Sequence, residues 1–162
     1  MIMKLNINNR AALAIKNNTK RVEIRANKDS KHDYSKLNNG DIIEFSSDEY
    51  GVIFVSVLEV NHYNSLEELF TLEGTRYTTS STNDKEEAIK SINSLDGYKE
   101  AINNSGVYAI HIKYLYSEDS VWDELYEKAK NVRNSRDVSG MISAGGVGAA
   151  ILTEGHNIYT GV

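Results

Sequence analysis

The stretch KRVEIRANKDSKHDYSKLNNGDIIEF, residues 20–45, contains two short strand patterns around which the rest of the chain is organised. From Val22 to Ala26, alternate residues are apolar and the residues between them are charged, which is the period-two pattern of a half-buried strand. The second apolar run, residues 41–45, follows an Asn-Asn-Gly turn signal at residues 38–40. The sequence therefore predicts two strands joined by a polar, lysine-containing loop.

The first strand carries the best candidate for a ligand-binding site. Glu23 and Arg25 project from the same side of that strand, and Lys20 lies at its entrance, so the three should face a shared concavity. Lys20 and Arg25 would meet phosphate or carbonyl oxygens, and Glu23 would accept a hydrogen bond from a base amine such as that of cytosine. The alternative is a solvated strand face with an ion pair that contributes little to stability.

Several motifs in order resemble the ASCH domain, a PUA-like β-barrel family. They are KRVEIR at 20–25, the basic loop with GDIIEF at 40–45, VLEV at 57–60, YNSLEEL at 63–69 and GVYAI at 106–110. The resemblance covers about residues 1–117, taken as the first domain. It implies a cleft that binds a nucleotide, a modified nucleoside or RNA. Stacking of bases on some of the ten tyrosines is the accompanying expectation, against ordinary packing of Tyr in strands.

One branch of ASCH-like proteins is similar to an amidohydrolase that removes acetyl groups from modified cytidine. That comparison implies a strand Thr as nucleophile, activated by a Lys. Lys20 matches the Lys, but the Thr position falls on Glu23, so this chain departs from the pattern at the nucleophile. Hydrolysis of N4-acetylcytidine with Lys20 and Glu23 remains an alternative function. Tyr63, Thr78 and Thr79 are further residues that would approach such a cleft.

Composition narrows the class of protein. The 162 residues suffice for one ordinary domain, or for a small domain plus a fragment, with 40% apolar and 25% charged residues. Residues 1–45 contain nine Lys or Arg and five Asp or Glu. The rest of the chain contains nine Lys or Arg and eighteen Asp or Glu, and the net charge of the whole chain is −5. A basic patch for phosphate on an acidic protein is one interpretation, and ordinary surface scatter is the other. No apolar run has membrane-spanning length and no signal peptide is evident, so no membrane association and a cytoplasmic location are expected.

The predicted fold class is α+β, a PUA-like mixed or antiparallel β-barrel with flanking helices. The strands are expected at residues 20–26, 41–46, 52–60, 106–116, 145–153 and 158–160, with the strand at 106–116 closing the barrel. The helices are expected at residues 8–18 with an Asn N-cap, from a capping box at Ser65 to Leu72, at 84–95, at 98–102 and at 120–134. Residues 135–143 are expected to be irregular, and residues 154–157 to form a hairpin turn.

A second resemblance covers about residues 121–162. The helix pattern LYEKAKNVR at 125–133, followed by VGAAILT at 147–153 and IYTGV at 158–162, is similar to the opening helix and first hairpin of the cytidine deaminase family. The second segment, residues 118–162, is therefore expected to be an incomplete deaminase-like domain that stops before the family's zinc site. The longer parent chain would then be a zinc-dependent cytidine deaminase. Glycines 145, 146 and 148 lack the rest of a phosphate-loop motif and indicate close packing of a strand.

This chain is expected to hold no metal and no cofactor. It has no Cys and no Pro, and its four His residues form no ligand-spaced pair. The hairpin lacks strands to cover its apolar face, so the segment should either dock on the barrel through Trp122 or pair with another chain. The leading hypothesis is a nucleotide- or RNA-recognition module without deaminase activity of its own. The alternatives are the modified-cytidine hydrolase and a protein-interaction barrel without a small ligand.

Overall fold

A computed structural model describes residues 1–133, 136–139, 142–144, 146–153 and 157–161. The chain forms two compact units, Met1–Tyr116 and Ser117–Val162. The first unit contains a five-stranded sheet, and the second contains two small sheets of two strands each in its described residues.

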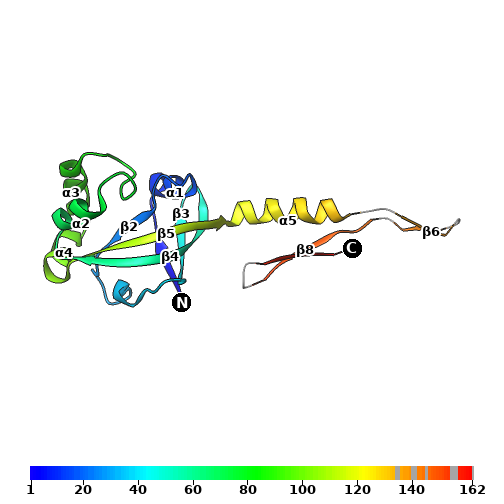
Figure 1. Cartoon of the computed structure of the whole chain (residues 1–162), viewed down its shortest axis with the longest axis horizontal. Helices are drawn as coiled ribbons and strands as arrows, with labels where there is room; N and C mark the ends of the chain where they lie inside the picture. The colour runs from blue at the N-terminus through cyan, green and yellow to red at the C-terminus, as the bar shows by residue number, and fades with distance from the viewer. Residues whose placement is uncertain (134–135, 140–141, 145, 154–156, 162) are drawn as a thin grey trace. The chain divides into compact units, whose positions relative to one another are not determined.

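The first unit is built on a curled five-stranded mixed sheet with the strand order β1-β3-β4-β5-β2 (Figure 1). The strands are β1 (Ile2–Asn6), β2 (Val22–Arg25), β3 (Ile42–Ser47), β4 (Gly51–Tyr63) and β5 (Val107–Ser117). β1 pairs with β3 in parallel, whereas β3 with β4 and β2 with β5 are antiparallel. This half-barrel, with its flanking helices and the hairpin of the second unit, confirms the predicted α+β fold class.

The edges of the sheet differ from the prediction. β1 was not expected, because IMKLN is short and does not alternate clearly. β5 was expected to close the barrel, but it lies inside the sheet between β4 and β2. The two edges are instead linked by a side chain, since Arg25 on β2 donates from Nη2 to the Asn6 carbonyl of β1 at 2.9 Å.

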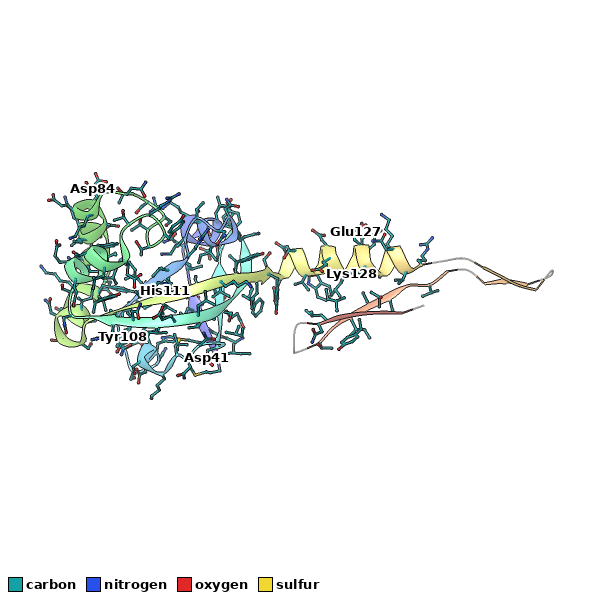
Figure 2. The ribbon with its side chains drawn as sticks, in the orientation of Figure 1. Asp41, Asp84, Tyr108, His111, Glu127 and Lys128 are labelled. Carbon is teal, nitrogen blue, oxygen red and sulfur yellow. The ribbon has the colours of Figure 1, made fainter. Side chains whose placement is uncertain are left out.

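Four α-helices flank the sheet: α1 (Asn9–Lys16), α2 (Leu66–Glu73), α3 (Lys85–Asn93) and α4 (Tyr98–Ser105). The predicted N-caps of α1 and α2 are confirmed. The Asn8 side chain accepts from the Ala11 N–H at 2.8 Å, and the Ser65 hydroxyl accepts from the Glu68 N–H at 3.1 Å. Asp84, at the start of α3 (Figure 2), caps that helix in the same way. Each of these three helices therefore begins at a side chain that satisfies an otherwise unpaired backbone donor.

The core of the first unit consists of two apolar clusters. One is centred on the fully buried side chains Phe45, Ile53 and Ile110 of three neighbouring strands. The other packs one side of β2 and β5 against α2, α3 and α4, which gather at one end of the sheet (Figure 1). Val22, Ile24 and Ala26 belong to this second cluster, so the alternation in the opening stretch turns its apolar residues inward as predicted.

The second unit contains α5 (Glu118–Val132) and four strands: β6 (Arg136–Ser139), β7 (Ile142–Ala144), β8 (Ala149–Leu152) and β9 (Ile158–Gly161). β8 and β9 form an antiparallel hairpin, as the sequence predicted, and this hairpin contacts α5. Residues 135–143 were expected to be irregular, but β6 and β7 pair there with a bulge, which the short and polar sequence did not signal. Most of the expected turn, residues 154–156, lies outside the described residues.

Two side-chain predictions for the second unit have different outcomes. Gly148 lies directly against α5, because an added Cβ would meet the Ala129 carbonyl, and this supports the close-packing interpretation of the glycines. The segment was expected to dock through Trp122, and 69% of the surface of this residue is exposed. Trp122 is therefore not a core residue of this unit, and docking through it stays a prediction.

Candidate functional site

The turn that ends α1 positions Lys20 just before the start of β2. Asn18 adopts a left-handed conformation with φ of 58°, and its N–H donates to the Ile15 carbonyl at 3.0 Å. The Thr19 N–H donates to the Ala14 carbonyl at 2.9 Å, which completes a Schellman motif. Asn tolerates this conformation better than most residues, so the Asn17-Asn18 pair ends the helix and reverses the chain two residues before Lys20.

Lys20 is buried, with 6% of its surface exposed, and its ammonium group is surrounded by acceptors. Its Nζ donates to the Val22 carbonyl at 2.8 Å and to the Thr78 carbonyl, and it lies 3.4 Å from Glu23 Oε2. Burial lowers the pKa of Lys20, although Glu23 acts in the opposite direction. These three interactions engage all three N–H donors of the ammonium group. Lys20 therefore holds Glu23 and the Thr78 backbone in place and has no free donor for a ligand.

The Glu23 carboxylate is held between two cations. Arg25 donates to Glu23 Oε1 from Nε at 2.8 Å, and Arg25 Nη2 lies at the same distance from that oxygen. Burial by itself would raise the pKa of Glu23, but Lys20 and Arg25 outweigh it and lower the pKa, so the group is ionised at neutral pH. A carboxylate has about four acceptor positions, and these partners occupy three of them.

These residues line a cavity of about 430 Å³ between β2, α1, α3 and the loop after α2. One wall is apolar and includes Ile24, Ile92 and Leu95, while the loop contributes hydroxyl groups. The charged lining residues are four cations and two carboxylates, namely Arg10, Lys20, Arg25, Lys28, Glu23 and Asp96. This combination of an apolar wall with a few convergent polar groups is typical of small-molecule sites of this size.

A second cavity of about 370 Å³ adjoins the first. Both are lined by Asn6, Arg25, Lys28 and Tyr98, which therefore stand between them. Lys28 Nζ lies 5.9 Å from the centre of the Tyr98 ring. Burial raises the pKa of Tyr98, so its hydroxyl stays protonated at neutral pH beside the Arg25 guanidinium.

The structure brings the three predicted site residues together in one lining. Lys20 and Glu23 each expose 6% of their surface, so the alternative of a solvated strand face is wrong. Sequence alternation cannot reveal this burial, because it depends on α1 and on the loop after α2 covering the charged side of β2. Thr78 and Thr79 also line the cavity, whereas Tyr63 is absent from its lining.

Other lining residues had no signal that distinguished them in the sequence. Arg10 follows the Asn8 cap, so a cation in the first turn of α1 was visible, but its approach to β2 was not. Lys28 and Tyr98 come together from positions 70 residues apart. Only the tertiary fold relates these positions to Glu23.

A second polar cluster lies around Glu73, at the end of α2. Glu73 Oε1 accepts from the Tyr63 hydroxyl at 2.7 Å and from Asn61 Nδ2 at 3.1 Å. His111 lies on β5 (Figure 2), and its Nε2 is 3.0 Å from the same oxygen. Burial together with Glu73 raises the pKa of Tyr63 to about 12. None of the four residues lines either cavity, so Tyr63 supports the fold here rather than the candidate site.

Two classes of site are absent from the described part of the chain. No three His, Asp or Glu side chains there come together in a way that would hold a metal ion. None of the described helices combines the length and the apolar content that a bilayer crossing requires.

Two solved structures are similar to this chain. The crystal structure of hypothetical protein PH0355 matches with 26% identity and a TM-score of 0.61, covering 71% of this chain and 100% of that chain. The solution NMR structure of protein PF0455 from Pyrococcus furiosus matches with 28% identity and a TM-score of 0.56, covering 71% of this chain and 98% of that chain. No family model and no curated protein matches the chain. The similarity therefore establishes a shared fold with small proteins whose names state no activity.

Proposed function

We propose that the first unit is a nucleotide-recognition module and that its cavity takes a nucleotide with an amine-bearing base. The observation that carries this proposal is the buried Glu23 carboxylate, which is held ionised by Lys20 and Arg25 and has one acceptor position left. A buried carboxylate of this kind favours a ligand that donates an N–H to it, such as cytosine with its N4 amine. Ile92 and Leu95 in the same lining provide an apolar surface for the flat face of a base.

The rim of the cavity suits a phosphate group. Arg10 and Lys28 are exposed lining residues, and neither forms an ion pair with a carboxylate of the described residues. Arg10 lies in the first turn of α1, where unpaired backbone N–H groups and the helix dipole also favour an anion. A nucleotide would thus place its base at Glu23 and its phosphate between these two cations.

The ASCH resemblance supports the same function and extends it to RNA or a modified nucleoside as the ligand. The deaminase-like pattern of the second unit supports a further step. In a longer chain with a complete zinc site, the module would recognise the nucleotide and the deaminase would act on it.

Titration with CMP and UMP tests the proposal. Wild-type protein should bind CMP more tightly than UMP, because uracil has a carbonyl where cytosine has its amine. The Glu23→Gln variant should lose this preference, since an amide can turn either a donor or an acceptor toward the base. Circular dichroism must accompany the titration, because removing the charge of Glu23 leaves two buried cations without their partner.

A variant at the rim keeps the test decisive if Glu23→Gln does not fold. Arg10→Ala should weaken CMP binding and flatten its salt dependence while leaving the fold intact, since Arg10 is exposed. The matched control is Arg133→Ala, which removes an exposed arginine of the second unit. Equal effects of these two variants, or no measurable binding of CMP by the wild type, would exclude nucleotide recognition and favour the protein-interaction barrel.

Hydrolysis of N4-acetylcytidine is a second candidate, favoured by the lowered pKa of buried Lys20. A lysine with a lowered pKa is better matched to proton transfer near neutral pH than an ordinary one. Of the hydrogen bonds made by the Lys20 ammonium group, those to Val22 and Thr78 go to carbonyl oxygens and none goes to a hydroxyl, so a Lys–Thr pair is not assembled in this arrangement. Chromatographic release of cytidine from N4-acetylcytidine, lost in Glu23→Gln while binding persists, would select the hydrolase.

A further inference from the structure

We infer that the first unit has a second subsite beside Tyr77 and that its ligand is a single-stranded oligonucleotide rather than a free mononucleotide. The inference rests on the proposed function, because the second subsite adjoins the cavity at Glu23.

Two arginines converge on one aromatic ring at this subsite. The guanidinium carbon of Arg21 lies 4.5 Å from the centre of the Tyr77 ring, and that of Arg76 lies 5.1 Å from it. Arg21 Nε also donates to the Asn18 carbonyl at 3.2 Å, so the left-handed turn that ends α1 orients this side chain. Neither guanidinium forms an ion pair with a carboxylate among the described residues, although both side chains are exposed. Most of their N–H donors therefore remain available to a ligand.

The surrounding surface suits a phosphodiester. A cavity of about 570 Å³ is lined by Arg21, Arg76 and Tyr77 without any Asp or Glu. Five hydroxyl-bearing residues also line it, namely Thr19, Thr79, Ser80, Ser81 and Thr82. The hydroxyls of Thr19 and Thr79 donate to backbone carbonyls and that of Thr82 donates to Glu87 Oε2 at 2.7 Å, which leaves those of Ser80 and Ser81 for a ligand. Two cations with no carboxylate in the same lining favour an anion, and the Ser80 and Ser81 hydroxyls would donate to phosphate or sugar oxygens. This lining carries a net positive charge in a protein whose overall charge is −5.

The subsite is continuous with the Glu23 cavity. Thr79, Ser80 and Ser81 line both cavities, so the loop that carries them forms the ridge between them. The loop is anchored to β2, because the Tyr77 carbonyl accepts from the N–H groups of Arg21 and Val22 at 2.8 and 3.0 Å. The carbonyl of the next residue, Thr78, accepts from Lys20. The two subsites therefore keep a fixed spacing, as two linked nucleotides require.

This arrangement assigns one nucleotide to the cavity at Glu23 and one to the cavity beside Tyr77. The first nucleotide places its base at Glu23, and the connecting phosphate crosses the hydroxyl-lined loop toward Arg21 and Arg76. Tyr77 holds the two guanidinium groups in place by cation–π contact and offers its exposed area to the second base. The recognised feature is the linkage between two nucleotides, which a mononucleotide lacks.

The test compares CMP with the ribodinucleotide pCpC and the deoxyribodinucleotide pdCpdC by calorimetric titration of the full chain. The dinucleotides should bind at least about tenfold more tightly than CMP, the effect of one charge-assisted contact. Preference for pCpC would identify RNA as the natural ligand, whereas equal binding would identify single strands of either kind. The double variant Arg21→Ala/Arg76→Ala should reduce dinucleotide affinity at least about tenfold and leave CMP affinity unchanged. Each lost phosphate contact should lower the slope of log K against log salt by about 0.7.

Matched variants separate the subsite from a general charge effect. Tyr77→Phe should retain dinucleotide affinity and Tyr77→Ala should lose it, while Tyr126→Ala and Arg133→Ala in the second unit should have no effect. Dinucleotide affinity equal to that of CMP, or equal losses of affinity for CMP and pCpC in the double variant, would overturn the inference. Neither result would contradict the proposed binding of a nucleotide at Glu23. Dinucleotide binding that depends on Tyr77 but not on Glu23 or Arg10 would support the subsite and reject the proposed function.

Discussion

Arg25 connects the candidate site to the five-stranded sheet. Its guanidinium binds Glu23 and also donates to the Asn6 carbonyl, so one side chain orients the carboxylate and links the two edge strands. Burial alone would lower the pKa of Arg25, but Glu23 outweighs it and raises the pKa, so the group stays charged. The planar guanidinium presents its donors in a fixed fork, so one side chain contacts both acceptors in a defined geometry. A single residue thus contacts both the candidate site and the opposite edge strand.

A pH-dependent contribution to stability is expected from Glu73. Burial would raise the pKa of Glu73, but the hydrogen bonds from Tyr63, His111 and Asn61 outweigh it and lower the pKa. The folded state therefore binds the proton less readily than the unfolded state does. The stabilisation is fully present above the unfolded-state pKa of about 4.3 and is lost as pH falls through the lowered folded-state pKa.

Replacing Glu73 by Gln makes this measurable. At pH 7 the variant should lose about 1–3 kcal/mol of unfolding free energy, because charge-assisted hydrogen bonds are weakened. The difference from the wild type should shrink below about pH 4, where the wild-type carboxyl becomes protonated as well. Urea denaturation at several pH values measures it, with Glu67→Gln on the exposed side of α2 as the control. A difference that stays constant from pH 7 to pH 3 would contradict the assignment.

At the scale of elements, the turn between α4 and β5 depends on a glycine. Gly106 has φ of 74°, and an added Cβ would meet the Tyr63 carbonyl and the His62 ring on β4. Gly106→Ala should therefore destabilise the protein by about 2–5 kcal/mol, combining the left-handed backbone cost with overpacking against a strand. Thermal unfolding of Gly106→Ala and Gly74→Ala measures the difference.

Gly74 is the matched control, since it ends α2 with φ of 73° but has open space where a Cβ would be added. Its replacement by Ala should cost only the backbone share, about 1–2 kcal/mol. Equal destabilisation by the two variants would show that the close approach of Gly106 to β4 does not contribute to the loss of stability.

At the scale of the whole molecule, the two units differ in how much apolar surface they bury. The first unit has two clusters of buried side chains, whereas Val121 is the one buried apolar residue among those described in α5, β8 and β9. Several large apolar side chains of the second unit are exposed, namely Trp122, Tyr126, Val147, Ile151 and Tyr159. An isolated helix and hairpin with so little burial are marginally stable, so the expectation that this segment docks or self-associates stands as a prediction.

Hydrogen exchange at two protein concentrations tests that expectation. In dilute monomer, amides of β8 and β9 should exchange much faster than those of β4 and β5, because local opening costs little free energy where burial is small. Protection of β8 and β9 should rise with concentration if a second copy covers the hairpin. Concentration-independent exchange as slow as that of β4, in a sample shown to be monomeric by light scattering, would contradict both docking to another chain and the marginal stability of the segment.

Much of the candidate site could be predicted because its centre lies within six consecutive residues. Glu23 and Arg25 share one strand face by the period of a strand alone, Lys20 lies just before that strand, and the structure places all three in one lining. What could not be predicted is that their charges are buried, since Lys20 is covered through Thr78, 58 residues away. The same holds for the Glu73 cluster, which joins α2, β4 and β5 without a shared motif.

The sequence by itself determined the features that depend on contacts between near neighbours in the chain. The caps at Asn8 and Ser65, the alternation of β2 and the helical spacing of α5 involve residues two to four positions apart, so their patterns can be read locally. The tertiary structure alone decided the strand order, the parallel pairing of β1 with β3 and the link from Arg25 to Asn6. These features depend on which distant segments bury one another's surface, and a strand's alternation is the same whether it lies at the edge of a sheet or inside it.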